Sequence, residues 1–281
     1  MRSHSAADDD LADFSRREVT LLGDTRTVYS LGSGPAVIII AEMPGIATTL
    51  ANFARRVAAC GATAVMPSVY GVDGRDPGPK AHRYLSAATG FLSTMTRACI
   101  SREFTILATG KTSPLVSWLR ALAEQEHERC GGVGVGAVGM CFTGGFALAM
   151  ATDDRLLAPV VSQPSLPFAL SPRRARSLDL SPGDLATVQA RCARGLEVMG
   201  LRFEGDRMSP PSRFTYLREV LGDAFYGIEL PDSSANPDSP LPTPHSPLTN
   251  DLIDAPGEPT REALDQVLTF LQRRLEITGA D

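Results

Sequence analysis

The sequence predicts an α/β fold in which helices cover both faces of a mostly parallel central sheet. Continuous apolar runs such as Ala36–Glu42 are rich in β-branched residues and are typical of strands buried on both faces of a sheet. These runs alternate with segments of helical periodicity. Helices between successive strands act as right-handed crossovers, so the strands form a parallel sheet. At 281 residues and 43% hydrophobic content the chain can bury a large core, and we expect a single domain over residues 16–281.

The first elements are a hairpin and a strand–helix–strand unit. Residues 1–15 are polar and acidic and are expected to form a flexible tail. Arg17–Leu22 and Thr25–Leu31 flank a short turn, which predicts an antiparallel hairpin. After the first apolar strand, Leu50–Cys60 shows helical spacing and Ala62–Pro67 predicts a second buried strand.

The alternation continues to the C-terminus. Further strands are expected at Gly134–Gly139, Leu157–Gln163, Val198–Glu204 and Ala224–Leu230. Further helices are expected at Leu115–His127, Thr143–Thr152, Pro182–Gly195, from Ser209 to about Leu221, and at Thr260–Leu275. Ser181 and Ser209 are suitable N-caps and are each followed by proline, an order that favours helix initiation.

One long segment interrupts this pattern. Residues 231–259 contain eight of the 21 prolines. Proline removes a backbone donor and fixes φ, so this segment is expected to be an extended loop. A loop of this length inside a compact domain is more often functional or disordered than incidental.

Composition and charge exclude several classes of protein. The formal net charge is −5, so the basic face of a nucleic-acid-binding protein is not expected. No apolar run approaches the ~18 residues of a membrane span, and the acidic N-terminus lacks the apolar segment of a secretory signal. The five cysteines are odd in number, far apart and never in a C-x-x-C pair. This spacing argues against a zinc site or a disulfide framework, and we expect a cytoplasmic protein with no metal and no cofactor.

Four reactive side chains follow predicted strands, where open α/β sheets carry their active sites. They are Glu42, Cys141, Asp206 and His245. His245 lies in the proline-rich loop, and it is the only histidine after Cys141. The other three histidines are better explained as solvated side chains.

Cys141 lies in the segment Gly139–Gly145 (GMCFTGG), which resembles the nucleophile elbow G-x-S-x-G with Cys in place of Ser and the second glycine shifted to Gly144. An elbow places the thiol near a helix N-terminus, which favours the thiolate. The backbone N–H of Phe142 and one from the loop at Met43 would then stabilise an oxyanion. The alternative is a buried core cysteine with no reactivity.

Asp206 and His245 complete the chain order of a hydrolase triad: nucleophile, acid, histidine. A carboxylate at Asp206 can accept the Nδ1 proton of a histidine and fix its tautomer. The alternatives are an ordinary turn aspartate and a surface histidine in a flexible loop.

These residues resemble those of the dienelactone hydrolase family, which has the α/β-hydrolase fold. The segments that carry the resemblance are Ile40–Gly45 (IAEMPG), Val65–Tyr70 (VMPSVY), the GMCFTGG elbow and Gly205–Arg207 (GDR). The resemblance implies Cys141 as nucleophile, His245 as base, Asp206 as its orienting acid, and Glu42 as a partner that helps to take the thiol proton.

The resemblance is incomplete in the residues that would bind substrate. Family members that act on dienelactone carry an arginine soon after the histidine, whereas Ser246–Asn250 (SPLTN) contains none. Arg102 could match the family's other substrate-binding arginine, or it is a surface residue. The expected substrate is therefore a small ester or lactone, cleaved through a thioester on Cys141, and its identity stays open.

Two other functions compete with this one. Gly134–Gly139 (GVGAVG) spells the dinucleotide-binding pattern G-x-G-x-x-G, but its glycines lie within a predicted strand rather than in the turn after it. Asp153 and Asp154 also come too early to bind a ribose, so we interpret this match as accidental. The second alternative is a protein of the same fold that binds a small ligand without turnover.

Overall fold

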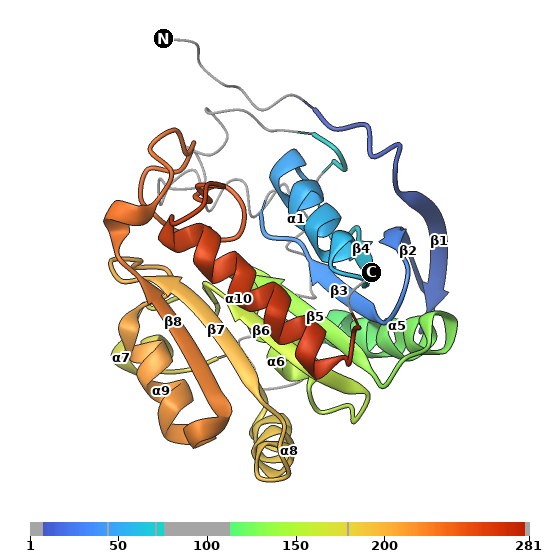
Figure 1. Ribbon diagram of the computed structural model, residues 1–281. Helices are drawn as coiled ribbons and strands as arrows, with labels where there is room; N and C mark the ends of the chain where they lie inside the picture. The colour runs from blue at the N-terminus through green and yellow to red at the C-terminus, as the bar shows by residue number, and fades with distance from the viewer. Residues whose placement is uncertain (1–7, 44, 71, 76–112, 179, 279–281) are drawn as a thin grey trace.

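The computed structural model describes residues 8–43, 45–70, 72–75, 113–178 and 180–278 (Figure 1). These residues form an eight-stranded sheet of order β1-β2-β4-β3-β5-β6-β7-β8. The strands are β1 Ser15–Leu21, β2 Asp24–Gly32, β3 Ala36–Ile40, β4 Thr63–Pro67, β5 Val135–Met140, β6 Leu156–Ser162, β7 Val198–Phe203 and β8 Phe225–Leu230. β2 pairs antiparallel with β1 and β4, and the pairings from β4 through to β8 are parallel. The prediction of a mostly parallel sheet is confirmed.

Helices cover both faces of this sheet, as Figure 1 shows. They are α1 Thr48–Ala59, α5 Pro114–Cys130, α6 Gly144–Met150, α7 Pro172–Ala175, α8 Pro182–Cys192, α9 Pro211–Leu221 and α10 Pro259–Arg274, with short 3₁₀ turns η2 Cys141–Thr143, η3 Gly222–Ala224 and η4 Asp232–Ser234. Side chains of α1 and α10 share one hydrophobic core, and those of α5, α6, α8 and α9 share the other. No helix in the described part of the chain is both long and apolar enough to cross a membrane.

Strand β3 shows why the apolar runs form the centre of the sheet. Ile38 and Ile40 pack into the core on the α5–α6 side, and Val37 and Ile39 pack into the core on the α1–α10 side. All four side chains are fully buried. Because each buried aliphatic side chain contributes roughly 1.5–3 kcal/mol, a strand with both faces covered has little freedom to change its register.

Residues 8–14 differ from the flexible tail expected for residues 1–15. Leu11 and Phe14 are buried in the α1-side core. On the same side, Arg55 of α1 forms ion pairs with Asp9 at 2.7 Å and Asp13 at 2.8 Å. The acidic residues that suggested a solvated tail are therefore partners of a helix, and this part of the segment packs on the fold.

Helix α9 begins one residue later than predicted. Its N-cap is Pro210, not Ser209, and no side chain caps it. The Arg213 N–H donates to the Pro210 carbonyl at 2.9 Å, whereas the Ser209 carbonyl accepts a hydrogen bond from Arg202 Nε at 2.7 Å. The short helix α7 was not predicted.

The proline-rich segment between β8 and α10 folds as an ordered loop with its own polar contacts. The Asn236 N–H donates to the Asp251 carbonyl at 3.0 Å, and the Asp251 N–H donates to the Ser246 carbonyl at 3.0 Å. These bonds draw the loop back on itself around His245, which is buried.

Candidate active site

Three side chains stand at the same level along the carboxyl edge of the sheet. In the parallel pairing of β3 and β5, Ile40 is opposite Gly139, so Glu42 and Cys141 each lie two residues further along. In the pairing of β5 and β6, Met140 is opposite Ser162, so Gln163 is level with Cys141. Neighbouring strands are about 4.8 Å apart, which places these residues in one row with Cys141 at its centre.

The backbone turns sharply at Cys141. Its φ is +55°, a left-handed conformation that costs a side-chain-bearing residue on the order of 1 kcal/mol. A Cβ at Gly139 would lie 2.2 Å from the Thr143 carbonyl oxygen, and one at Gly144 would lie 2.7 Å from Cα of Pro164. The glycines therefore allow the close approaches that this turn requires, as expected of a nucleophile elbow.

Thr143 fixes the elbow to the neighbouring strand. Its hydroxyl lies 3.0 Å from the Ile40 carbonyl oxygen and accepts the Met140 N–H at 3.0 Å. Cys141 itself is only 4% exposed. The thiol is thus held at a defined height above the sheet edge by the backbone around it.

Asp206 and His245 are joined by a hydrogen bond, although 39 residues separate them in the sequence. Oδ2 of Asp206 lies 2.8 Å from Nδ1 of His245. Oδ1 accepts the backbone N–H groups of Met208 at 2.9 Å and Ser209 at 3.2 Å, which leaves Oδ2 turned toward the histidine. This is the contact that a tautomer-fixing acid makes with a general base.

The environment of His245 favours its protonated form. Burial by itself lowers the pKa of His245, but the Asp206 carboxylate and the Cys141 thiol outweigh this and raise the pKa well above its usual value. Nε2 of His245 is buried and has no hydrogen-bond partner within standard geometry among the described residues. A histidine that is held at Nδ1 and interacts with a neighbouring thiol has the arrangement of a general base beside a nucleophile.

Glu42 connects the sheet edge to the histidine loop. Its carboxylate is 4% exposed and accepts hydrogen bonds from Gln163 Nε2 at 3.0 Å, Ser246 Oγ at 2.6 Å and the Thr249 hydroxyl. Among the described residues its hydrogen bonds go to these three side chains and not to the thiol. Cys141 and Glu42 both lie near Tyr70, because each reinforces burial in raising the pKa of Tyr70 well above its usual value.

Two polar residues of the site were not indicated by the sequence. Asp251 is buried, and its Oδ2 accepts the backbone N–H groups of His245 at 2.8 Å and Ser246 at 2.7 Å. Gln163 was assigned only as the last residue of a strand. Neither residue is a nucleophile, base or acid placed after a strand, so neither met the criterion that found the other four.

The proposed oxyanion-hole residues both follow strand-end residues of this edge. Phe142 is buried directly after Cys141 and makes an edge-to-face contact with Phe168 at 5.6 Å between ring centres. Met43, directly after Glu42, packs against the same hydrophobic core. Cys141 itself belongs to this same core. Arg102, the expected substrate-binding residue, lies outside the described residues.

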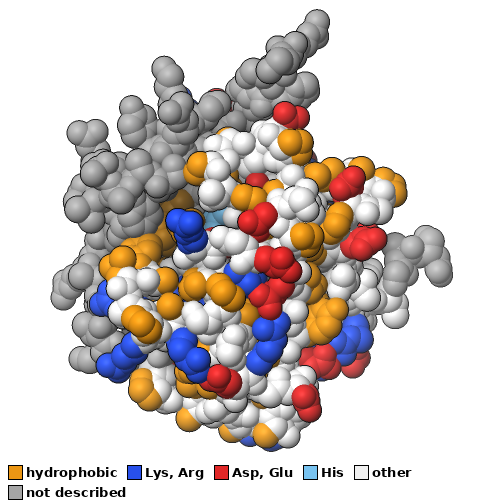
Figure 2. Space-filling model, turned by 90° about the vertical axis from the view of Figure 1, so that its left-hand side faces the viewer, with side chains coloured by type: hydrophobic (Ala, Val, Ile, Leu, Met, Phe, Trp, Pro, Cys, Tyr) orange, Lys and Arg blue, Asp and Glu red, His pale blue; other side chains and the backbone are white. Residues whose placement is uncertain are grey.

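The surface view in Figure 2 shows a histidine side chain in a recess, with hydrophobic side chains gathered beside it. Acidic and basic side chains are interspersed on this face and form no large patch of one sign. Within the described part of the chain, no group of three or more His, Cys, Asp or Glu side chains is arranged to hold a metal ion.

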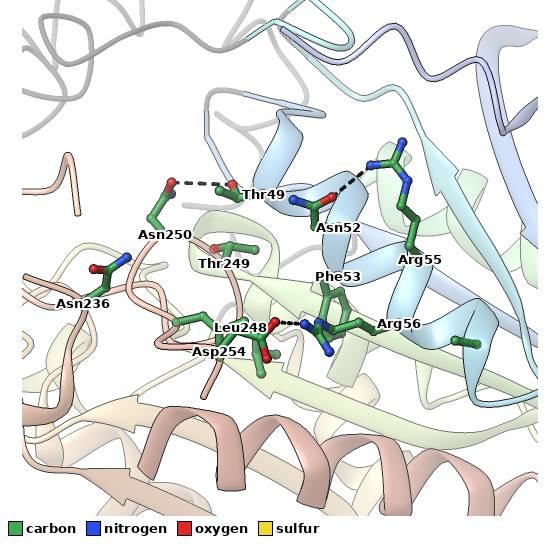
Figure 3. A pocket seen from close by; sticks show the side chains of 12 residues that line it. Thr49, Asn52, Phe53, Arg55, Arg56, Asn236, Leu248, Thr249, Asn250 and Asp254 are labelled. Atoms are coloured by element: carbon green, nitrogen blue, oxygen red, sulfur yellow. Dashed lines mark hydrogen bonds and ion pairs between the residues drawn. The ribbon is translucent and has the colours of Figure 1, made fainter. Parts of the chain in front are cut away.

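A polar groove of about 470 Å³ separates helix α1 from the histidine loop (Figure 3). Thr49 lies 3.5 Å from Asn250 across it, and Arg56 pairs with Asp254. Thr249 also lines the groove, although its hydroxyl donates to Glu42. The groove therefore marks where the loop is fastened to α1, and Cys141, Asp206 and His245 do not line it.

Comparison with known proteins gives a family match for part of the chain. The model of the dienelactone hydrolase family matches residues 24–172. No curated protein matches the sequence.

Solved structures show the same fold at low sequence identity. A candidate dienelactone hydrolase from Klebsiella pneumoniae subsp. pneumoniae MGH 78578 has a TM-score of 0.58 and 17% identity, covering 92% of this chain and 99% of that one. A dienelactone hydrolase from Anabaena variabilis ATCC 29413 has a TM-score of 0.56 and 12% identity, covering 94% and 99%. A cold-adapted esterase from an Arctic intertidal metagenomic library has a TM-score of 0.57 and 13% identity, covering 98% and 100%. The likeness to all three is one of fold.

Proposed function

Because this chain belongs to the dienelactone hydrolase family, we propose that it hydrolyses the ester or lactone bond of a small molecule with Cys141 as the nucleophile. One observation carries the proposal. The left-handed Cys141 at the sheet edge and the Asp206–His245 pair, joined at 2.8 Å, come from distant parts of the chain, and Cys141 is close enough to His245 to help raise the pKa of the imidazole. A structural cysteine in the core needs no such partners.

In the proposed reaction the thiol loses its proton and its sulfur attacks the substrate carbonyl carbon, forming a C–S bond. The carbonyl electron pair moves to oxygen, where the N–H groups of Phe142 and Met43 would stabilise it. Collapse of this intermediate breaks the C–O bond, and the departing oxygen takes up the proton that the thiol lost. The product still attached to Cys141 is a thioester.

Water then completes the cycle. His245 takes a proton from water, whose oxygen attacks the thioester carbon. The C–S bond then breaks to release the carboxylic acid, and the Cys141 sulfur takes the proton back from the imidazolium. Asp206 stabilises the imidazolium that forms in this step. A reducing cytoplasm, the proposed location, would keep the thiol free.

Glu42 is proposed as the group that helps to remove the thiol proton. Its position level with Cys141 on the adjacent strand supports this role. Its carboxylate is buried and already oriented by neutral donors, so it can accept a proton without losing an ion-pair partner. Arg102 remains a proposed contact of the substrate.

Hydrolysis of p-nitrophenyl acetate and of a panel of neutral and carboxylated lactones tests the proposal. Wild type should hydrolyse at least one of them, and Cys141→Ala should reduce kcat by at least about a hundredfold. Cys192→Ala is the matched control and should retain wild-type rates, because Cys192 is half-buried on helix α8. Equal rates in wild type and Cys141→Ala would remove Cys141 from the mechanism. Saturable binding without turnover would instead support the ligand-binding alternative.

A further inference from the structure

We infer that Gln163 is a positioning residue that holds the Glu42 carboxylate beside Cys141 across the end of strand β5. This inference rests on the proposed function, because it concerns how the thiol loses its proton. Gln163 is buried, with 1% of its surface exposed, directly after the last residue of β6.

The path of the Gln163 side chain is the first argument. In the sheet, β5 lies between β3 and β6. Nε2 of Gln163, the residue directly after β6, donates at 3.0 Å to Oε2 of Glu42, which lies two residues beyond β3. The side chain therefore spans the strand between them at the level of Cys141, and the nucleophile lies at the centre of this bridge.

The bridge is fixed at both of its ends. The Ser162 hydroxyl donates to Oε1 of Gln163, which leaves the amide NH₂ to face the carboxylate. The backbone of Gln163 has a φ of +31°, in the left-handed region where a side-chain-bearing residue is strained. Its N–H also donates to the Leu201 carbonyl of β7 at 2.7 Å. Residues held this firmly in a strained conformation concentrate at functional sites.

The residues after Gln163 fix the nucleophile from the same side. The Ser165 N–H donates to the Cys141 carbonyl at 2.9 Å, and Pro164 packs against Gly144 so closely that a Cβ there would lie 2.7 Å away. One short segment therefore contacts both the elbow and the carboxylate. It sets the distance between the group that gives the proton and the group that takes it.

The three side chains that donate to the Glu42 carboxylate come from different parts of the fold, and this shows what Gln163 adds to its positioning. Ser246 and Thr249 belong to the histidine loop, whereas Gln163 belongs to the sheet. Without Gln163 the carboxylate would be held by the loop alone and would follow its movements. Because the amide is neutral, it orients the carboxylate without cancelling the charge that draws the thiol proton.

Gln163→Met tests the bridge, because methionine keeps the volume and flexibility of glutamine but cannot donate. We expect kcat/KM for p-nitrophenyl acetate to fall about tenfold, the size of one lost hydrogen bond to a charged group, with KM within about twofold. Alkylation of Cys141 by iodoacetamide should slow by a similar factor. Gln189→Met is the matched control, since Gln189 is exposed on α8, and should change neither rate.

A double-mutant cycle separates positioning from packing. If Gln163 acts through Glu42, Gln163→Met should cost less than about twofold in a Glu42→Ala background. An equal loss in both backgrounds, or no loss in either, would overturn the inference. The proposed function has its own test in Cys141→Ala: if that variant keeps full activity, the mechanism fails, whereas an inactive Cys141→Ala with an unaffected Gln163→Met refutes the role of Gln163 alone.

Gln163→Glu supplies a pH signature that lost packing does not produce. A carboxyl group at this position can donate to Glu42 only while the two acids share a proton, and two buried carboxylates repel each other. The ratio of variant to wild-type kcat/KM should therefore fall as pH rises. A ratio that does not change with pH would contradict the bridge.

Discussion

The two halves of the site are held in place by different physical means. Cys141 sits on the sheet, where strand pairing, a left-handed turn and close glycine contacts determine its position. His245 sits on a long proline-rich loop, where hydrogen bonds to the buried carboxylates Asp206 and Asp251 determine its position. One half depends on packed volume and the other on charge and hydrogen bonding.

Because of this difference, the elbow and the histidine loop should respond to different kinds of substitution. A substitution that adds volume should damage the elbow, whereas a substitution that removes a carboxylate should damage the histidine loop. Glu42 is the point where the halves meet, because it accepts hydrogen bonds from Gln163 of the sheet and from Ser246 of the loop. Changes on either side of Glu42 should therefore affect the same chemical step.

The largest effect is expected at the histidine itself. His245→Ala removes the proposed base while leaving the thiol in place, and kcat/KM should fall by about 10²–10⁴-fold, the usual contribution of general acid–base catalysis. Steady-state hydrolysis of p-nitrophenyl acetate measures this, with circular dichroism to show that the fold is retained. A folded variant with near wild-type activity would exclude His245 as the base.

The next effect is a change in pH dependence when the acid partner is removed. Neutral His245 is the form that accepts a proton, so wild-type activity should rise with pH through a pKa well above 6.5. In Asp206→Asn the nearby negative charge is lost and burial dominates, so the rising limb should move to lower pH while the maximum rate falls by about a hundredfold. A kcat/KM profile across pH 5–10 gives both quantities. If kcat/KM of Asp206→Asn rose over the same pH range as in wild type, Asp206 would not control the charge of His245.

Added volume at the elbow should lower stability. Gly144→Ala places a Cβ 2.7 Å from Cα of Pro164, which should destabilise the protein by about 2 kcal/mol. Gly183→Ala is the matched control in helix α8, where the nearest atom to a Cβ is 3.9 Å away, and it should be neutral or stabilising by about 0.5–1 kcal/mol. Urea unfolding of both variants tests the comparison. Similar losses at both sites would mean that the elbow is not tightly packed.

The smallest effect concerns the two hydrogen bonds that Asp251 accepts from the backbone of the histidine loop. Asp251→Ala leaves two buried N–H groups without their acceptor, which should cost about 1–2 kcal/mol and reduce kcat by loosening His245. Asp251→Asn keeps an acceptor oxygen and removes a carboxylate whose pKa is raised by burial. A raised pKa means that ionisation opposes folding as pH increases, so this variant should become more stable relative to wild type as pH rises. Unfolding curves at pH 4 and pH 8 measure the difference, and a constant difference would contradict it.

Much of the sheet could be predicted because its signals are local. The β-branched run of β3 and the GMCFTGG elbow each determine their own structure, and the rule that reactive residues follow strands identified Glu42, Cys141, Asp206 and His245. The structure brings Asp206 and His245 into contact and places Glu42 level with Cys141.

The polar connections between these residues could not be predicted. Gln163 reaches Glu42 because β6 lies next to β5 and β5 lies next to β3. No single segment of the sequence predicts this strand order. Asp251 accepts backbone N–H groups six and five residues earlier, through the fold of a loop that carries no periodic pattern. The burial of Leu11 and Phe14 was not predicted, because the acidic residues around them suggested a solvated tail. The partner of those acids, Arg55, lies on a helix distant in the sequence.

Trapping the acyl group on the enzyme tests the central claim most directly. His245→Ala should still be acylated but release the product slowly, so brief reaction with p-nitrophenyl acetate followed by peptide mass spectrometry should find the acetyl group on Cys141. Cys60 and Cys192 should stay unmodified, because burial raises the pKa of both thiols. Acetylation of another residue, or turnover by wild type with no acetyl-Cys141 in the variant, would contradict the account.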